Sequence, residues 1–193
     1  MPTEINETTD QNAKNFLTKS EMKKFLEAAR KGRHGVRDFC LMLTAYRHGL
    51  RVSELIDIRL KDLDFDSARI YVRRLKGSLS THQPIEGDEL RAIRAWLKIR
   101  DNYPNSNSNY LFLSERGPLI RQAVNYLVEQ IGKRAKLGFK VNPHMLRHST
   151  GYYLANKGCD TRLIQDDYLG HKNITHTVRY TRTAAHRFEG LWR

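Results

Sequence analysis

The sequence predicts a mainly α-helical domain that carries one small antiparallel β-sheet. Apolar residues recur at helical spacing along most of the chain, and β-rich segments bounded by turn residues gather in residues 63–85. The chain has 193 residues, of which 39% are hydrophobic, and this is enough to build the core of a single domain. We therefore expect the α+β class, with helices before and after the sheet.

A capping box marks the first predicted helix. Thr18 and Glu21 stand three residues apart, as N-cap and N3 residues do at a helix start. The apolar face of this helix is formed by Met22, Phe25, Leu26 and Ala29. A second helix is expected over residues 36–47, ended by Gly49, and a short third helix over residues 51–58.

The predicted sheet is a meander of three strands. Its strands are expected at residues 63–65, 69–75 and 82–85, with turns at residues 66–67 and 76–77. After a polar loop, residues 110–113 form a further short strand candidate. The remaining helices are expected at residues 88–100, 121–137, 143–157, 160–168 and 172–180.

The chain is strongly basic. Lys and Arg number 34 and Asp and Glu number 21, so the net charge is 34 − 21 = +13, and the sequence pI is about 9.9. A polyanionic partner such as nucleic acid is the first interpretation, and an ordinary solvated basic surface is the second. The basic residues are dispersed along the chain, which favours a charged face of a folded domain over a basic tail.

Cysteine usage and hydropathy exclude several classes of protein. Cys40 and Cys159 show no Cys-x-x-Cys or Cys/His ligand spacing, so neither a disulfide framework nor a zinc site is predicted, and both are expected to pack as small core residues. No apolar run approaches membrane-span length, and residues 1–18 lack the apolar stretch of a signal peptide. We expect a cytoplasmic protein without a membrane partner.

Three residues of the helix that begins near Pro143 share a face. His144, Arg147 and His148 stand at i, i+3 and i+4. An arginine there can hold a phosphate through two parallel N–H bonds, and a neighbouring imidazole can exchange a proton. The alternative is a charged, solvated helix face.

A histidine and a tyrosine follow at a fixed interval. His171 comes directly after Leu169 and Gly170, where a helix end meets a loop, and Tyr180 stands nine residues later. The alternatives are a turn histidine and an ordinary half-buried tyrosine, because the chain has nine Tyr.

Two earlier segments carry basic residues with a candidate role. Arg51 begins the short third helix, and Glu54, three residues on, can hold it by a charge-assisted hydrogen bond. Lys76 lies at a hairpin tip, where it can reach a DNA groove and protonate a leaving oxygen. Arg73 and Arg74 beside it are expected to contact backbone phosphates. The alternative for the basic residues is a solvated surface, and the alternative for Glu54 is a helix cap or an exposed i, i+3 partner.

Taken in order, these segments resemble the catalytic domain of the tyrosine recombinases, the phage-integrase type. The matching elements are residues 49–55 (GLRVSEL), Lys76, residues 144–148 (HMLRH), residues 169–171 (LGH) and Tyr180. The resemblance covers residues 16–182 and implies that family's catalytic-domain fold. It leaves residues 1–15 as a polar, mobile lead and residues 183–193 as a C-terminal segment that docks on a neighbouring protomer or packs on its own domain.

The resemblance implies a covalent mechanism. Tyr180 attacks the scissile phosphate to form a 3′-phosphotyrosine and frees a 5′-hydroxyl. Arg51 and Arg147 hold the non-bridging oxygens and stabilise the charge of the transition state. No metal and no cofactor are implied, because the arginines supply the positive charge and the covalent link conserves the bond energy.

Three further catalytic residues and one supporting residue complete the implied mechanism. Lys76 protonates the 5′ leaving oxygen, and His144 accepts the tyrosine proton. His171 donates a hydrogen bond to the phosphate, and Glu54 supports the site from behind.

Three segments narrow the resemblance to the small recombinases that invert fimbrial promoter elements: residues 162–165, 176–181 and 185–193. The implied partners are double-stranded DNA with inverted-repeat sites and further copies of the chain in a tetramer on synapsed DNA, in the nucleoid. The N-terminal DNA-clamping domain of typical members is not found in the sequence, so DNA-bending accessory proteins are also expected. Integration or excision of a mobile element, a type IB topoisomerase and a non-catalytic DNA-binding regulator are the alternatives.

One departure from the subgroup pattern stands just before His171. Asp166 and Asp167 occupy a stretch where the pattern has a single Asp. One extra residue rotates an α-helix by about 100°. Either the loop before His171 absorbs this rotation or the helix changes register.

Overall fold

The structure is a computed structural model that describes residues 14–75 and 78–170. Lys76, His171 and Tyr180 therefore lie outside the described residues, as do the helix expected at residues 172–180 and the C-terminal segment of residues 183–193. Nearly all of the lead predicted at residues 1–15 lies outside them too.

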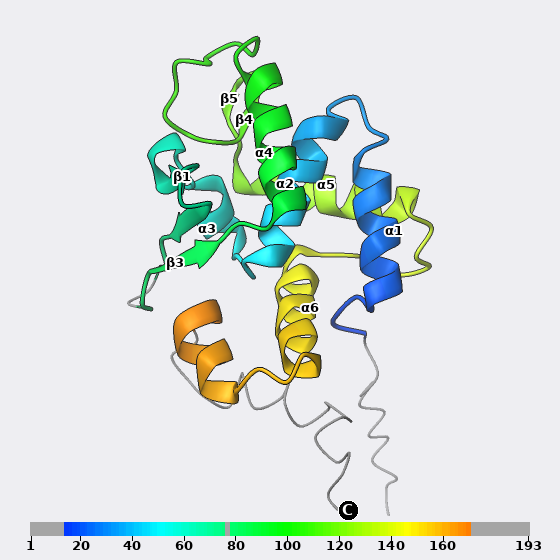
Figure 1. Cartoon of the computed structure of the whole chain (residues 1–193). Helices are drawn as coiled ribbons and strands as arrows, with labels where there is room; N and C mark the ends of the chain where they lie inside the picture. Colours follow the sequence, from blue (N-terminus) through cyan, green and yellow to red (C-terminus); the bar gives the residue numbers. More distant parts are fainter. Residues whose placement is uncertain (1–13, 76–77, 171–193) are drawn as a thin grey trace, which may run out of the picture.

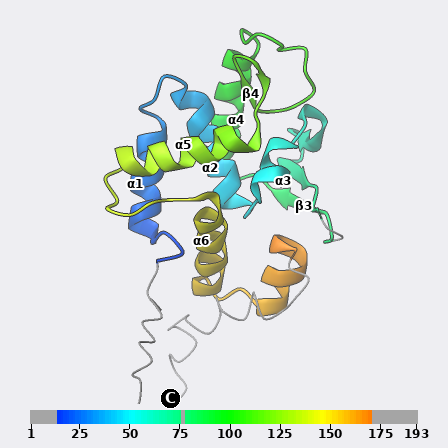
Figure 2. The same ribbon diagram turned by 180° about the vertical axis from the view of Figure 1, so that it is seen from behind.

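Helices dominate the described part of the chain. The larger body contains α1 (Lys19–Ala29), α2 (Gly35–Arg47), α4 (Gly87–Arg100) and α5 (Arg121–Arg134). The shorter α3 (Val52–Ile56) and the 3-10 turn η1 (Leu60–Asp62) lead from α2 into the sheet. Below this body lie α6 (Pro143–Asn156) and η2 (Leu163–Leu169), as the front and back views show (Figures 1 and 2). The mainly α-helical prediction is confirmed.

The helix ends follow the local chemistry of the sequence. The Thr18 side chain accepts a hydrogen bond from the Glu21 N–H, and the Glu21 carboxylate accepts one from the Thr18 N–H at 2.8 Å, so the predicted capping box is confirmed. At α6, Asn142 caps the helix by accepting from the Met145 N–H at 3.2 Å, and Pro143 occupies the first turn.

The predicted three-stranded meander is also present. It consists of β1 (Leu63–Asp64), β2 (Arg69–Val72) and β3 (Thr81–Pro84), antiparallel and in that order. A second hairpin, β4 (Leu113–Ser114) with β5 (Gly117–Pro118), replaces the strand expected at residues 110–113. Strands of two residues are too short to show the alternation on which strand prediction depends.

One large hydrophobic core joins the larger body to α6, and a smaller cluster lies between α6 and η2. The side chains of Phe25, Leu41, Trp96 and Phe112 have no exposed surface, and the Trp96 indole N–H donates to the Leu111 carbonyl at 2.9 Å. Cys40 is fully buried in this core, as predicted, and Cys159 is half-buried beside a smaller cluster under η2. The core fixes α2 and α3, and the first candidate residues of the site, Arg51 and Glu54, stand at the start of α3 and within it.

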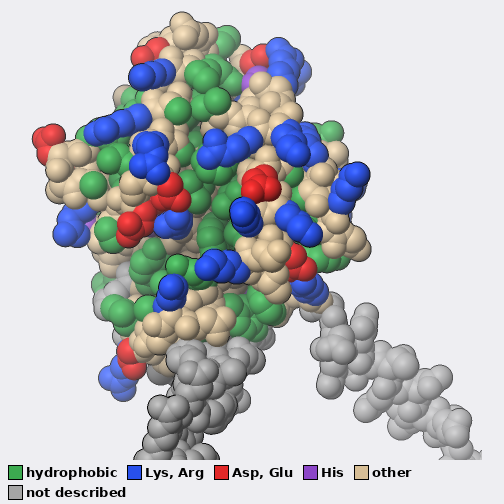
Figure 3. Space-filling view, turned by 45° about the vertical axis from the view of Figure 1, so that its right-hand side comes forward, with side chains coloured by type: hydrophobic (Ala, Val, Ile, Leu, Met, Phe, Trp, Pro, Cys, Tyr) green, Lys and Arg blue, Asp and Glu red, His purple; other side chains and the backbone are tan. Residues whose placement is uncertain are grey.

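The surface and the helix lengths add two findings. Lys and Arg side chains are spread over the face in Figure 3 and are interspersed with fewer acidic ones. Within residues 14–75 and 78–170, no helix combines the length and the apolar character needed to cross a membrane.

The capping box gives a stability prediction. We expect Thr18→Ala to lower the free energy of unfolding by about 1 kcal/mol, because the N–H groups at the start of α1 lose their side-chain acceptor. Urea unfolding followed by circular dichroism measures the change. Ser20→Ala, an exposed change inside the same first turn, is the control, and an equal loss in both variants would contradict the capping role.

Candidate active site

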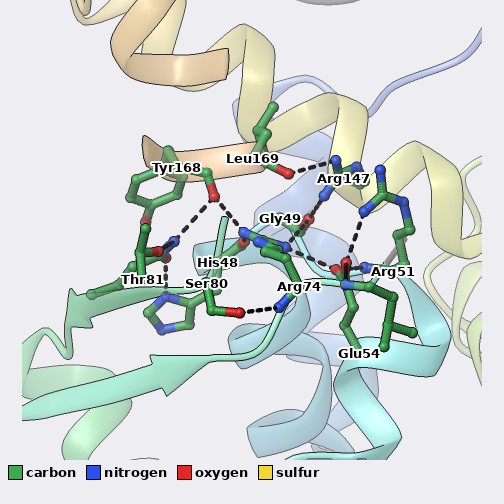
Figure 4. Close-up of polar contacts among 12 residues, drawn as sticks. His48, Gly49, Arg51, Glu54, Arg74, Ser80, Thr81, Arg147, Tyr168 and Leu169 are labelled. Atoms are coloured by element: carbon green, nitrogen blue, oxygen red, sulfur yellow. Dashed lines mark hydrogen bonds and ion pairs between the residues drawn. The ribbon is translucent and has the colours of Figure 1, made fainter. Parts of the chain in front are cut away.

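The site is built around the buried carboxylate of Glu54, which is only 3% exposed. This carboxylate accepts from the Arg51 N–H at 2.9 Å, Arg51 Nη1 at 2.7 Å, Arg74 Nη1 at 2.8 Å and the Leu75 N–H at 3.4 Å. Arg51 is the N-cap of α3 and Glu54 its third residue, so the contact to the Arg51 N–H is the usual reach-back of an N3 glutamate. The predicted support of Arg51 by Glu54 is present (Figure 4).

The charges around Glu54 keep it ionised. Burial on its own would raise the pKa of Glu54, but the charge of Arg74, the hydrogen bond from the Arg51 N–H, and the charges of Arg147 and Arg51 outweigh burial and hold that pKa below its ordinary value. Three guanidinium groups and one carboxylate leave a net charge of 3 − 1 = +2. Such a cluster attracts an anion to the adjoining surface.

Arg147 connects α6 and η2 to the site around Glu54. It lies on α6, is 6% exposed, and donates from Nη1 to the Gly49 carbonyl and from Nη2 to the Leu169 carbonyl at 2.8 Å. The guanidinium therefore lies between the turn after α2 and the end of η2. The structure brings Arg51, Glu54 and Arg147 together, as the resemblance implies.

Gly49 permits the close approach of these segments. Its φ is +56°, and a Cβ at this position would meet Leu169 Cδ2 at 2.3 Å. A side chain would be strained by the left-handed backbone and would also displace the buried Leu169 side chain. The glycine that precedes Arg51 in the sequence is thus required by the contact between α2 and η2.

The helix before His171 differs from the expected α-helix. Residues Leu163–Leu169 form a π-helix that ends at Gly170 in the left-handed conformation, with φ +61°. An i→i+5 hydrogen bond encloses one residue more than the i→i+4 bond of an α-helix. A π-helix is therefore one place where an additional residue at 166–167 can be accommodated. His171 lies outside the described residues, so both expected outcomes, a rearranged loop or a changed helix register, stay predictions.

Arg74 does not occupy the predicted place on the surface. Its side chain has no exposed surface, and its Nη2 donates to the carbonyls of His48, at 2.8 Å, and Tyr168. The structure contradicts the predicted phosphate contact, because the guanidinium is enclosed by protein. The signal was available in the strand period, since Ile70, Val72 and Arg74 alternate on one face and the first two are buried.

Arg73 points the other way and is partly exposed. Its Nη1 donates to Asp57 Oδ2 at 3.0 Å and its Nη2 to Asp62 Oδ1 at 3.1 Å. Two carboxylates thus already offset its charge. The phosphate contact of Arg73 stays a prediction.

His144 lies exposed at the first turn of α6 and lines an open groove of about 780 Å³. Arg51, whose side chain is 29% exposed, lines the same groove. The groove continues past Leu75 to residues of α5 and the loop after it, among them Arg121, Asn125, Tyr126 and Lys140. His144 and Arg51 therefore face a common space that also carries further basic side chains.

The described neighbours of two predicted residues also reach the site. Leu75, which precedes Lys76, donates its N–H to Glu54 and lines the groove. Leu169, two residues before His171, accepts from Arg147. Among the residues at 14–75 and 78–170, no group of three or more His, Cys, Asp and Glu has the arrangement of a metal site.

Comparison with known sequences gives one family. The phage integrase family profile matches residues 15–187. The type 1 fimbriae regulatory protein FimB of Escherichia coli (strain K12) is 47% identical over 184 residues, which cover 95% of this chain and 92% of FimB. FimE of the same strain is 47% identical over 92% of this chain and 90% of its own. The tyrosine recombinase XerA of Thermococcus onnurineus is 38% identical over 86% of this chain and 57% of its own.

Solved structures are similar as well. The crystal structure of XerA recombinase matches with a TM-score of 0.76 at 29% identity, over 86% of this chain and 58% of that one. XerH recombinase bound to palindromic difH substrate, in a post-cleavage complex, matches with a TM-score of 0.78 at 26% identity, over 95% and 54%. The chain thus spans little more than half the length of these two solved proteins.

The central carboxylate gives a pH-dependent prediction. We expect Glu54→Gln to lower the free energy of unfolding at neutral pH by about 3 kcal/mol, because buried guanidinium groups lose their counter-charge. The folded-state pKa of Glu54 lies below its ordinary value of 4.5, so the stabilisation is fully present above pH 4.5 and is lost as the pH falls through the folded pKa. The difference between wild type and variant should therefore shrink below pH 4.5.

Urea unfolding at a series of pH values measures this difference. Glu129→Gln is the matched control. Like Glu54, Glu129 pairs with two basic side chains, in this case Lys133 and Lys140, but it does so at the surface. We expect that control to change stability little. A loss in Glu54→Gln that is independent of pH would rule out the proposed ionised carboxylate.

Proposed function

Since the chain belongs to the phage integrase family and is a tyrosine-type site-specific recombinase, we propose that it inverts a promoter element that switches fimbrial gene expression. The observation that carries the proposal is the 47% identity to FimB and FimE, both named type 1 fimbriae regulatory proteins, over nine tenths of their lengths. The predicted fold, the tyrosine recombinase catalytic-domain fold, is confirmed by the likeness to XerA and XerH.

We propose that Arg51 and Arg147 bind the scissile phosphate. Glu54 holds Arg51 Nη1 while part of the Arg51 side chain stays exposed to the groove. The charge of Arg147 acts on the same cluster, since it helps to lower the pKa of Glu54. Positive charge fixed in place before the substrate arrives stabilises the additional negative charge of a pentavalent phosphate.

Proton transfer in this proposal involves three residues. The bond from Tyr180 Oη to phosphorus forms as the bond from phosphorus to the 5′ oxygen breaks. His144 takes the tyrosine proton, and Lys76 gives a proton to the leaving 5′ oxygen. The exposed position of His144 on the groove that also holds Arg51 supports its part. His171, as in the family resemblance, donates a hydrogen bond to the phosphate.

The groove that carries Arg51 and His144 is the proposed path of the DNA. Arg121 extends its basic character beyond the site, while Lys140, on the same groove, pairs with Glu129. The substrate in this proposal is double-stranded DNA with inverted-repeat sites, bound by a tetramer with the help of DNA-bending proteins, in the nucleoid of the cytoplasm. Residues 16–182 form the catalytic domain, and residues 183–193 dock on a neighbouring protomer.

A nicked suicide substrate tests the nucleophile. The wild-type protein should form a covalent protein–DNA adduct, because the short strand released by cleavage diffuses away and the reaction cannot reverse. Tyr180→Phe should form no detectable adduct while it still binds the DNA. Denaturing gel electrophoresis detects the adduct. Tyr153→Phe, at a partly exposed tyrosine of α6, is the control and should react like the wild type, and an adduct with Tyr180→Phe would refute the assignment.

A plasmid assay separates inversion from the alternatives. In a purified reaction, the protein should invert a plasmid segment that is flanked by its inverted-repeat recombination sites. Restriction mapping detects the inversion. Recovery only of deletion or integration products would favour the mobile-element role, and relaxation without exchange would favour a topoisomerase. The same reaction should proceed in the presence of a chelator, since the arginine cluster supplies the positive charge.

A further inference from the structure

Arg74 joins separate segments of the active site through one buried side chain. Its Nη1 donates to Glu54 Oε2 at 2.8 Å and to the Gly49 carbonyl at 3.4 Å. Its Nη2 donates to the carbonyls of His48, at 2.8 Å, and Tyr168. One guanidinium therefore links α3, the end of α2 and the end of η2 (Figure 4).

The same contacts connect Arg74 to both proposed phosphate-binding arginines. Glu54 holds Arg51 by an ion pair of 2.7 Å, and the Gly49 carbonyl also accepts from Arg147. A shift of the Arg74 guanidinium would move the acceptors that fix both side chains. Arg74 thus acts on the arginine pair through the acceptors that it shares with them, the Glu54 carboxylate and the Gly49 carbonyl.

Arg74 is also connected to the other two proposed catalytic segments. Lys76 stands two residues after it in the sequence, and the Arg74 N–H donates to Ser80 Oγ at 3.0 Å, which links the two sides of the connection between β2 and β3. Tyr168, whose carbonyl Arg74 binds, stands three residues before His171. Gly170 leaves room for this side chain, because a Cβ there would meet Arg74 Cγ at 3.2 Å.

A comparison within the chain argues against a purely structural role for Arg74. Arg100 is equally buried, and its Nε, Nη1 and Nη2 all donate to backbone carbonyls in the loop that follows α4. Arg74 instead shares the Glu54 carboxylate with Arg51 and lies beside the charges of Arg51 and Arg147. Its contacts therefore join groups of the site, whereas those of Arg100 hold one loop.

We propose that Arg74 is a positioning residue. It binds the Tyr168 carbonyl at the end of η2 and the Glu54 carboxylate that orients Arg51, so the docking of η2 and the orientation of Arg51 depend on each other. The inference rests on the proposed recombinase function and adds a residue to it. When η2 is docked, its Tyr168 carbonyl completes the coordination of Arg74, and Arg74 in turn fixes Glu54 and the Gly49 carbonyl. The two arginines and the segment that leads to His171 are then assembled as one unit.

Single-turnover cleavage of the nicked substrate tests this role. At saturating DNA, Arg74→Gln should lower the rate of adduct formation on the order of 100-fold, because displaced catalytic groups lose their alignment. The DNA concentration at half-maximal rate and the salt dependence of binding should stay at the wild-type values, because Arg74 is enclosed by protein. Arg74→Lys should recover part of the rate, since an ammonium can pair with Glu54 but lacks the planar fork that reaches the carbonyls.

Arg100→Gln is the matched control for loss of a buried arginine. Assayed below the unfolding transitions of both variants, it should cleave at nearly the wild-type rate. In a Glu54→Gln background, Arg74→Gln should have a much smaller effect than in the wild type, because the two changes interrupt one network.

Two results would overturn the proposal. A decrease of about 0.9 in the salt slope of Arg74→Gln would identify a phosphate contact. A rate loss no greater than that of Arg100→Gln at equal folded fraction would reduce Arg74 to a stabilising residue. Failure of the proposed cleavage roles would look different, because the wild-type protein itself would then form no adduct. Failure of the proposed inversion would appear only in the plasmid assay and would leave adduct formation unchanged.

Discussion

The carboxylate of Glu54 is the group on which the arrangement of the site depends. Without its negative charge, the charges of Arg51, Arg74 and Arg147 would repel one another in a region that water reaches poorly. With it, two of the guanidinium groups form direct ion pairs of 2.7 and 2.8 Å. The cluster still has a net positive charge, so Glu54 organises the arginines without cancelling the charge that a phosphate requires.

Backbone carbonyls are the other acceptors that hold the arginines of the site in place. The end of α2 turns through Gly49, whose carbonyl accepts from two arginines, and the end of η2 presents the carbonyls of Tyr168 and Leu169 to the same guanidinium groups. Both helix ends have carbonyls without partners in their own helix, and arginines satisfy them. The arginines that satisfy the ends of α2 and η2 are therefore also the arginines of the site. A glycine with positive φ, Gly49 after α2 and Gly170 after η2, lets the chain turn at each of these ends.

The sequence was sufficient for features that depend on neighbouring residues. The capping box at Thr18, the helix that begins near Pro143 and the meander were all predicted from local pattern. The burial of Arg74 was missed because an arginine at a strand end is usually solvated, and its acceptors come from segments distant in the sequence. The π-helix was missed because hydrophobic periodicity distinguishes a helix from a strand but not a π-helix from an α-helix. The contacts that stabilise the π-helix join the carbonyls of η2 to arginines from distant parts of the sequence.

The π-helix and the buried arginines are best understood together. A π-helix is rarer than an α-helix and persists where surrounding contacts compensate for it. Here the compensation comes from Arg74, Gln83 and Arg147, which all donate to the last carbonyls of η2. These contacts are made to main-chain oxygens at the helix end, where the register of the side chains has little influence. The arginines that form the site therefore also hold the two residues that precede Gly170.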